Sequence, residues 1–189
     1  MKKNFIHHAI MQISVLRLIP ALLVIFILSS CDTTDPFSFE PPDFSTVPPA
    51  FDYTEVDPVT VEPGIDVHVL EEGTGTFSVT QRDQISFLVT LRSLDGDIIY
   101  SSFSNGNALP ITNQRVDQIR LSNGIINPRS PILLYTSGLR KGLTGMKVGE
   151  IRTIIVSPEQ GYADVTAGLT AEYSESTLQY DIELTNIVN

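Results

Sequence analysis

The sequence predicts an α+β fold, built from several short β-strands and a single short helix. Apolar and polar residues alternate in two segments, Ile85–Arg92 and Leu178–Thr185, and this period of two is typical of half-buried strands. Between them, the glycine-rich run Gly138–Gly145 has the pattern of a short amphipathic helix that leads into an apolar strand, Ile151–Val156. Pro158 ends this strand, since proline has no amide hydrogen to donate to a sheet.

Length and composition indicate one domain with appendages. The chain has 189 residues, with 12 Lys+Arg against 22 Asp+Glu and a formal net charge of −10. A nucleic-acid partner requires a basic surface, so this charge balance argues against nucleic-acid binding. The only cysteine, Cys31, cannot form an internal disulfide, and a small secreted domain held together by disulfides is therefore excluded.

The N-terminus has the pattern of a secretory signal peptide. Basic residues precede the apolar run Leu18–Leu28, which is shorter than the ~20 residues of a comfortable membrane span. The sequence Leu28-Ser29-Ser30-Cys31 resembles a bacterial lipobox, in which the cysteine is acylated and the chain is cut before it. We expect residues 1–30 to be a lipoprotein signal peptide and Cys31 to be the lipid attachment site. An uncleaved anchor with an incidental cysteine is the alternative.

Cleavage before the cysteine would set the net charge of the mature chain and leave that chain attached to a membrane. It would remove the basic residues of the leader and no acidic ones, leaving 9 basic against 22 acidic residues and a net charge of −13. Two or three acyl chains give a stable membrane anchor where a single chain is marginal. The expected location is therefore the cell envelope, with the chain lipid-anchored to a bacterial membrane on its periplasmic or surface face.

Residues 31–63 are expected to be the acylated cysteine and a flexible, proline-rich tether. The segment has no periodicity, and its many prolines exclude a helix. Its composition favours extended, polyproline-like conformations, as in a spacer that holds a domain away from a membrane. Aromatic residues within it leave a second interpretation open, in which they pack onto the domain or onto a partner (Phe37, Phe39, Phe44, Phe51 and Tyr53).

Residues 64–189 are the expected folded domain. Val67–Leu70 is its opening strand, and a turn cluster follows. Asp95-Gly96 is a hairpin signal, after which Ile98–Ser102 begins the return strand. His68 is the only histidine after residue 30. It has no histidine or cysteine partner, so we predict a solvated strand position for it and no metal site.

The interval 103–131 is expected to form an enlarged flap. It contains the turn-forming sequences Asn105-Gly106-Asn107, Asn123-Gly124 and Asn127-Pro128 between short apolar segments. An extra hairpin at Asn123-Gly124 fits this pattern. Long inserted loops often modify function, although simple surface decoration is the alternative.

Three separated motifs resemble the FKBP-type peptidyl-prolyl isomerases. The run G-L-x-x-G-L-x-G-M-x-V-G-E begins at Gly138, and a strand and then S-P-x-x-G-Y, ending at Tyr162, follow it. The other two are D-G-x-x-x-x-S-S from Asp95 and S-T-L-Q-Y-D-I-E-L at residues 176–184. The resemblance covers residues ~65–189. It implies an FKBP-like twisted antiparallel β-sheet, half-wrapped around one short α-helix near residues 138–144.

The resemblance also implies a cup that binds the substrate proline. Tyr162 matches a tyrosine that donates a hydrogen bond to the substrate carbonyl in this family. Tyr180 stands in place of a phenylalanine, and Tyr100 in place of an aspartate that polarises the pocket. These three are the expected catalytic residues. The expected substrate-binding residues are Val89, Ile99, Tyr135, Thr136 and Leu139.

Several cup positions depart from the family pattern. Val89 replaces a tyrosine, Ile99 a phenylalanine and Leu139 the usual tryptophan. Because each aromatic ring can bury about 150–250 Å², we expect a weaker affinity for proline than in typical members. Tyr100 and Tyr135 would refill part of the lost surface.

Prolyl isomerisation is rotation about one amide, with a barrier of ~20 kcal/mol. It needs an apolar cup with one or two hydrogen-bond donors, and no metal or cofactor. The resemblance implies a membrane-anchored peptidyl-prolyl cis-trans isomerase that assists folding of exported proteins. Its partners would be proline-containing polypeptides and, through the N-terminal lipid, the membrane; a monomer is expected. A catalytically weak or inactive FKBP-like protein-binding module of the cell envelope is the alternative, and a structural subunit of an envelope complex is a third interpretation.

Overall fold

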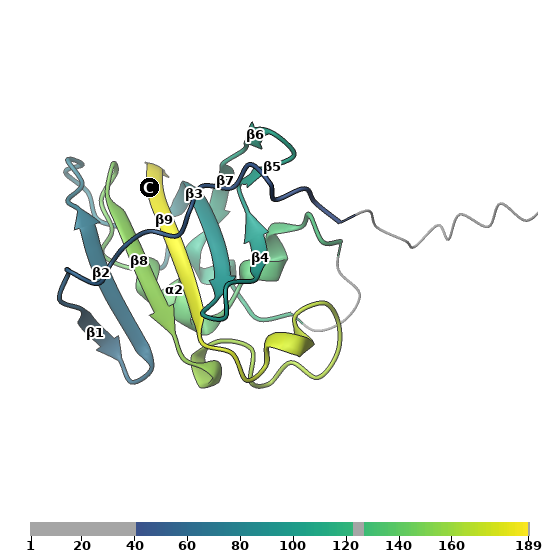
Figure 1. Cartoon of the computed structure of the whole chain (residues 1–189). Coiled ribbons are helices and arrows are strands. Elements are labelled where there is room, and N and C mark those ends of the chain that lie inside the picture. The colour runs from purple at the N-terminus through teal and green to yellow at the C-terminus, as the bar shows by residue number, and fades with distance from the viewer. Residues whose placement is uncertain (1–40, 123–126, 189) are drawn as a thin grey trace, which may run out of the picture. The chain divides into compact units, whose positions relative to one another are not determined.

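The computed structural model describes residues 41–122 and 127–188. Its main element is a twisted antiparallel sheet, against which the other elements pack (Figure 1). Its strands are β1 (Val59–Glu62), β2 (Ile65–Glu71), β3 (Gln84–Ser93), β4 (Ile98–Ser101), β7 (Ile111–Arg115), β8 (Ile151–Val156) and β9 (Leu178–Val188). They lie in the order β1-β2-β8-β9-β3-β4, and β7 pairs with β3 beside β4. The twisted antiparallel sheet with one short helix that the sequence predicted is confirmed.

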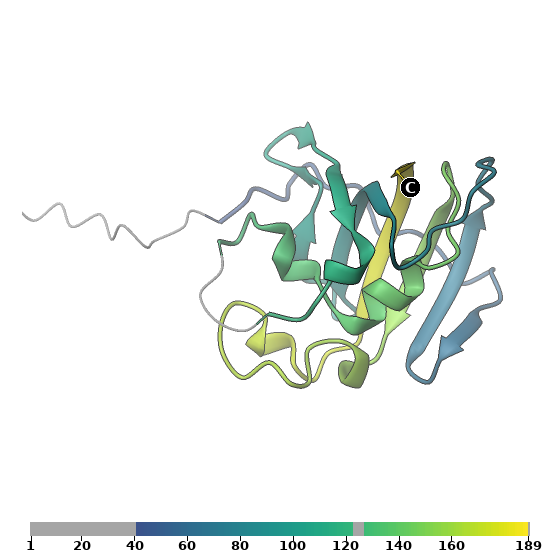
Figure 2. The ribbon, with the colours of Figure 1, turned by 180° about the vertical axis from the view of Figure 1, so that it is seen from behind.

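Among the residues that the structure describes, one α-helix lies on one face of this sheet and several 3₁₀ helices accompany it. Figure 2 shows α2 (Ser137–Leu143) in front of the strands. The 3₁₀ helices are η1 (Val116–Gln118), η2 (Pro131–Leu134), η3 (Pro158–Gln160) and η4 (Ala171–Tyr173). Because the helix of seven residues is too short to be stable alone, its packing on the sheet must stabilise it.

Glycines let α2 approach β8 closely. A Cβ atom on Gly138 would lie 2.3 Å from a methyl carbon of Val156, and one on Gly142 would lie 2.6 Å from the side chain of Ile154. Such distances are far below van der Waals contact, so only glycine fits at either position. Thr136 begins the helix, since its hydroxyl oxygen accepts a hydrogen bond of 3.0 Å from the amide of Leu139.

The end of α2 is held by a buried ion pair. The guanidinium of Arg152 in β8 donates to the carbonyl of Gly142 at 2.7 Å and also to the carboxylate of Glu150. Glu150 in turn accepts a hydrogen bond of 2.9 Å from the amide of Lys147. This network connects the last turn of the helix, the corner after it and the start of β8.

The predicted hairpin at Asp95-Gly96 joins β3 to β4. Gly96 has a φ of +106°, which other residues rarely adopt, and its amide donates to the carbonyl of Ser93 at 3.0 Å. Leu91 and Tyr100 face each other in the resulting ladder.

Residues 41–58, which we call the strap, pack against the sheet. Figure 1 shows this segment crossing in front of the strands, on the face opposite α2. The Phe51 amide donates to the Asp181 carboxylate at 3.1 Å, and Arg92 donates to the Pro48 carbonyl at 2.5 Å. The spacer predicted for residues 31–63 differs from the structure here, because the half-buried Arg92 of β3 and the buried Asp181 of β9 bind the backbone of the strap.

The strap also covers His68. The Nδ1 atom of this residue lies 2.7 Å from the carbonyl oxygen of Val56, and the ring of Tyr53 packs against it with centroids 4.6 Å apart. His68 is buried, so the predicted solvated position is wrong. The other interpretation of the aromatic residues, packing onto the domain, describes Tyr53 correctly.

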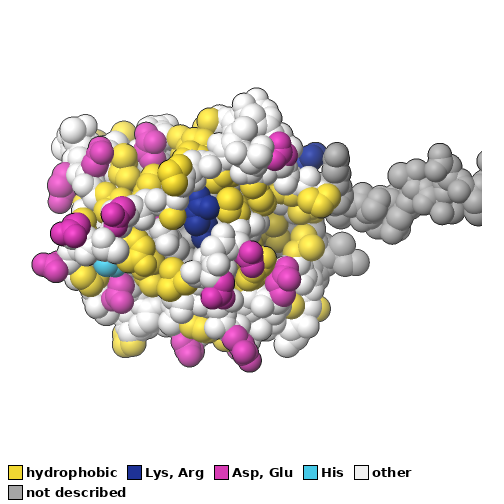
Figure 3. All heavy atoms as spheres, viewed as in Figure 1, with side chains coloured by type: hydrophobic (Ala, Val, Ile, Leu, Met, Phe, Trp, Pro, Cys, Tyr) yellow, Lys and Arg dark blue, Asp and Glu magenta, His cyan; other side chains and the backbone are white. Residues whose placement is uncertain are grey.

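An apolar groove remains between the strap and the sheet. It has a volume of about 220 Å³, and its lining includes Pro48, Pro49, Phe51, Leu88, Phe103 and Ile151. Figure 3 shows hydrophobic side chains over the middle of this face, with acidic side chains mainly towards its margins.

Residues 103–131 contain regular structure. The short strands β5 (Phe103–Ser104) and β6 (Asn107–Ala108) form a hairpin whose turn residues, Asn105 and Gly106, have φ values of 53° and 72°. β7 then extends the sheet edge. The hairpin predicted at Asn123-Gly124 lies outside the described residues, as do the predicted signal peptide and Cys31. Within residues 41–122 and 127–188, no helix has the length and apolar character of a membrane span.

Candidate active site

The residues expected to form the cup come together in the hydrophobic core. They lie on β3, on β4, around the start of α2, after η3 and on β9. Each is at most 9% exposed (Val89, Ile99, Tyr100, Tyr135, Thr136, Leu139, Tyr162 and Tyr180). The lining predicted from the resemblance is thus assembled in space, but nearly all of it is closed off from solvent.

Two tyrosine hydroxyls converge on η2. Tyr162 donates its hydroxyl hydrogen to the backbone carbonyl of Leu133. Tyr180 donates to the carbonyl of Leu134 at 3.0 Å, and its hydroxyl also lies 2.9 Å from that of Thr136. The donor that the resemblance assigns to a substrate carbonyl is therefore occupied by a carbonyl of the chain itself.

The segment that supplies these carbonyls was not recognised from the sequence. Pro131 occupies the first turn of η2, and the Ser130 hydroxyl accepts a hydrogen bond of 3.4 Å from the amide of Ile132. Leu133 and Leu134 are buried and anchor the turn in the core. Ser130-Pro131 followed by three apolar residues was the available signal, because serine and proline favour the start of a helical turn.

Burial keeps the site tyrosines protonated. It raises the pKa of Tyr162 well above the usual 10.0, with a further contribution from the nearby Tyr180. It also raises the pKa of Tyr180, and it raises that of Tyr135 to about 12, the latter with help from Tyr100. At neutral pH these phenols are hydrogen-bond donors, and none of them can serve as a base.

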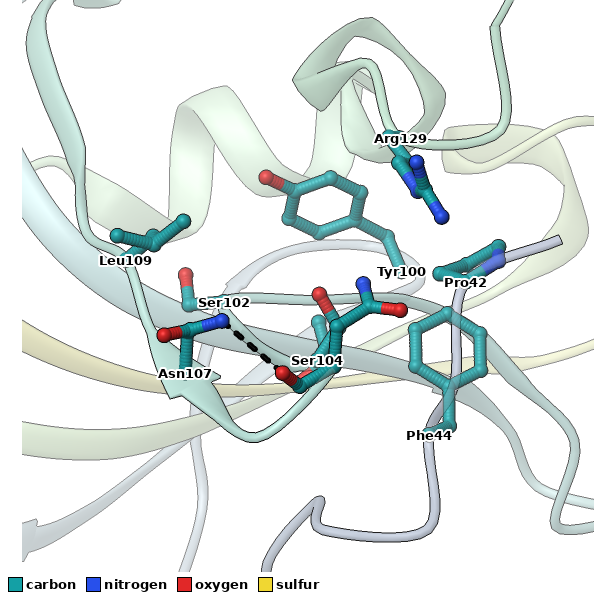
Figure 4. Close-up of a pocket in the computed structure, with 10 residues that line it drawn as sticks. Pro42, Phe44, Tyr100, Ser102, Ser104, Asn107, Leu109 and Arg129 are labelled. Carbon is teal, nitrogen blue, oxygen red and sulfur yellow. Dashed lines mark hydrogen bonds between the residues drawn. The ribbon is translucent and has the colours of Figure 1, made fainter. Parts of the chain in front are cut away.

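Tyr100 and Tyr135 lie at the margin of the cup. The hydroxyl of Tyr135 donates to the side-chain oxygen of Gln114 in β7, a partner that the sequence did not reveal. Tyr100 lines a cavity of about 160 Å³ between the strap, the β5–β6 hairpin and the segment before η2 (Figure 4). This cavity connects one expected catalytic residue with solvent.

The groups that the site presents are hydroxyl hydrogen-bond donors and apolar side chains. Within residues 41–122 and 127–188, no three His, Cys, Asp or Glu side chains are placed to hold a metal ion. What the site offers is a set of neutral phenol donors within an apolar environment. Such an arrangement can bind a polypeptide carbonyl and withdraw it from water.

Comparisons with known proteins agree on the fold. The family model described as FKBP-type peptidyl-prolyl cis-trans isomerase matches residues 75–185. No curated protein matches the chain. Among solved structures, FkpA from Escherichia coli is similar with a TM-score of 0.51 and 21% identity, over 70% of this chain and 51% of FkpA. This chain thus spans about half the length of FkpA.

Two plant structures are similar as well. The N-terminal domain of FKBP42 from Arabidopsis thaliana has a TM-score of 0.51 and 15% identity, covering 76% of this chain and 99% of that domain. A multi-domain immunophilin from Arabidopsis thaliana has a TM-score of 0.50 and 15% identity, covering 74% of this chain and 47% of that protein. At such identities the structural similarity establishes the fold alone.

Proposed function

The chain belongs to the FKBP-type peptidyl-prolyl cis-trans isomerase family, and we propose on this basis that it isomerises X-Pro bonds in polypeptides. The observation that carries the proposal is the set of phenol donors in a buried apolar site. Tyr162 and Tyr180 already bind backbone carbonyls, which have the same chemistry as the carbonyl of an X-Pro amide.

The physical basis is preferential binding of the twisted amide. Rotation through a barrier of ~20 kcal/mol requires the amide to lose its planarity and its conjugation. A site that removes the amide from water and binds the twisted form better than either planar form lowers this barrier. Val89, Ile99 and Leu139 give the walls an aliphatic character, and we expect modest catalysis because aromatic surface is lacking at these positions.

The proposal includes location. The lipobox-like sequence ending at Cys31 supports a lipid anchor in the cell envelope, and an enzyme held there would assist the folding of exported proteins. Since the strap binds the sheet through Pro48 and Phe51, these residues would not contribute to a free tether.

A specific observation favours the second candidate, a protein-binding module with little or no catalysis. The hydroxyl of Tyr162 is engaged by Leu133, so a substrate must either displace η2 or bind elsewhere. A cup that stays closed would leave the rest of the surface, including the groove under the strap, for binding a partner.

The test is an isomerisation assay with a proline-containing tetrapeptide and the full chain. The proposed enzyme accelerates cis-to-trans exchange above the buffer rate, and Tyr162→Phe, which loses the hydroxyl that the resemblance assigns to the substrate carbonyl, is slower. Tyr53→Phe is the matched control, because this tyrosine belongs to the strap and packs against His68, outside the expected cup. Peptide binding by the folded wild type without any acceleration would reject the enzyme in favour of the binding module.

A further inference from the structure

The tyrosines of the site fall into two groups. Tyr135, Tyr162 and Tyr180 each donate their hydroxyl to an acceptor within the chain. The hydroxyl of Tyr100 has no acceptor among the described residues, and it belongs to a residue that lines an open cavity. A donor without an internal partner is available to an incoming carbonyl, whereas the others must first break an existing bond.

The cavity beside Tyr100 is small and has a mixed apolar and polar lining. Figure 4 shows Leu109 and Asn107 on one side and Pro42 and Phe44 on the other, with the Tyr100 ring beyond them. Its volume of about 160 Å³ is enough for one or two side chains rather than for a whole ligand. Its lining combines apolar side chains with polar ones and with Arg129, and a mixture of this kind suits a peptide.

The wall formed by the strap is fixed in place. The amide of Asn105 donates to the carbonyl of Asp43 at 2.8 Å, and the amide of Asp43 donates to the side-chain oxygen of Asn105 at 3.1 Å. The amide of Gly106 donates to the hydroxyl of Thr46 at 3.2 Å. Strap and hairpin therefore form one surface, and the cavity between them and Tyr100 is preformed.

Tyr100 also borders the closed cup. It is close enough to Tyr135 to raise the pKa of that residue, and β4 packs against η2. A peptide in the cavity could thus place an X-Pro carbonyl at the Tyr100 hydroxyl without moving Leu133. The apolar rings of Phe44 and Tyr100 would contact the proline or its neighbours.

We infer that Tyr100 donates the hydrogen bond to the substrate carbonyl, and that the client chain binds in the cavity between the strap and the β5–β6 hairpin. Tyr162 is then a positioning residue that holds η2. This assignment rests on the proposed isomerase function. It involves no covalent step, because rotation about the amide breaks no σ bond. The hydrogen bond from Tyr100 would hold the carbonyl in place while the proline side of the amide turns.

The test compares three matched substitutions in the full chain: Tyr100→Phe, Tyr162→Phe and Tyr53→Phe. The readout is kcat/KM for a proline tetrapeptide, with the folded fraction measured by circular dichroism and used to correct the rate. We expect kcat/KM to fall about tenfold in Tyr100→Phe, which is the effect of one lost hydrogen bond. In Tyr53→Phe, kcat/KM should equal that of the wild type. After correction for the folded fraction, kcat/KM should fall less in Tyr162→Phe than in Tyr100→Phe. An unchanged rate in Tyr100→Phe, together with a large loss in Tyr162→Phe, would overturn the inference and leave the isomerase proposal standing.

A second measurement tests the inference even if the chain binds proline peptides without catalysing their isomerisation. Tyrosine ring signals are followed by NMR during titration with the same peptide and with a peptide that has alanine in place of proline. We expect the proline peptide to shift the Tyr100 signals, identified by their loss in Tyr100→Phe, and Phe44→Ala to weaken binding. Shifts confined to Tyr162 would overturn the inference. A wild type that neither catalyses nor binds would refute the proposed function itself, and the inference with it.

Discussion

The hydroxyl of Tyr162 donates to the backbone carbonyl of Leu133, and this bond joins the segment after η3 to η2. Both residues are almost completely buried, so water cannot replace either partner. The bond is therefore a structural element of the fold, whatever part it plays in catalysis.

Tyr162→Phe should lower the free energy of unfolding by about 1–3 kcal/mol, because it leaves the buried Leu133 carbonyl without its donor. Urea denaturation of the two proteins measures the difference. Tyr53→Phe, in which the lost hydroxyl lies outside this site, is expected to be nearly neutral. Equal stability of Tyr162→Phe and wild type would show that Leu133 finds another donor.

Gly138→Ala should destabilise the chain. The added methyl would lie 2.3 Å from Val156, and overpacking of this kind costs about 1–3 kcal/mol. The gain in helix propensity from glycine to alanine is about 1 kcal/mol, so the clash decides the sign. Val156→Ala removes the clashing methyl groups, and Gly138→Ala should cost less in that background. Additive losses in the double-mutant cycle would exclude a direct clash.

Glu150→Gln should be costly, because Arg152 would remain as a buried charge without its carboxylate. Breaking one side of a buried ion pair typically costs about 3–5 kcal/mol. The double variant Glu150→Gln/Arg152→Met should lose less free energy of unfolding than the sum of the losses in the two single variants. Thermal unfolding at neutral pH measures all four proteins. A loss close to zero for Glu150→Gln would indicate that the Gly142 carbonyl alone holds Arg152.

The strands and the helix were predictable because they leave local signals. Period-two alternation marks β3 and β9, and the glycines at 138 and 142 mark the place where a helix meets β8. The strap was not predictable from composition. Its proline-rich sequence resembles a spacer, and the groups that bind it belong to Arg92 and Asp181, far along the chain.

In the candidate site, too, some features were predictable from the sequence and others were not. Side chains that the resemblance identified, such as Tyr162 and Tyr180, are buried together. The contacts that decide their availability involve the backbone carbonyls of Leu133 and Leu134, and a backbone acceptor has no signature in the side-chain sequence. The cavity beside Tyr100 needs the strap as one wall, so it could not be anticipated while the strap was taken for a spacer.

Stability should decrease in alkaline solution through Tyr135. Its pKa is about 12 in the folded chain against a usual 10.0, so folding disfavours its ionised form. A group with a raised folded pKa contributes its stability in full below the unfolded value and loses it as the pH rises through the folded value. The free energy of unfolding should therefore fall as the pH rises from 10 to about 12. In Tyr135→Phe this decline should be shallower, as measured by urea curves on either side of pH 10. An identical slope in the variant would assign the decline to other groups.

Removal of the strap should destabilise the sheet. A chain that begins at residue 59 lacks the Phe51 amide that binds Asp181 and the Pro48 carbonyl that binds Arg92. Water would hydrate the two exposed charged groups, so each lost hydrogen bond should cost only about 0.5–1.5 kcal/mol. Exposure of the apolar groove, including Leu88, adds to this, and we expect a total loss of roughly 2–4 kcal/mol.

A chain that begins at residue 41 is the matched control, because it keeps every described contact of the strap. Urea denaturation of the two truncated chains measures the contribution of residues 41–58. Equal stability would mean that the strap binds the sheet too weakly to matter, and the wall of the Tyr100 cavity would then be mobile. A clear loss on removing the strap, accompanied by weaker binding of a proline peptide, would connect the strap both to the stability of the sheet and to the cavity that we assign to the client chain.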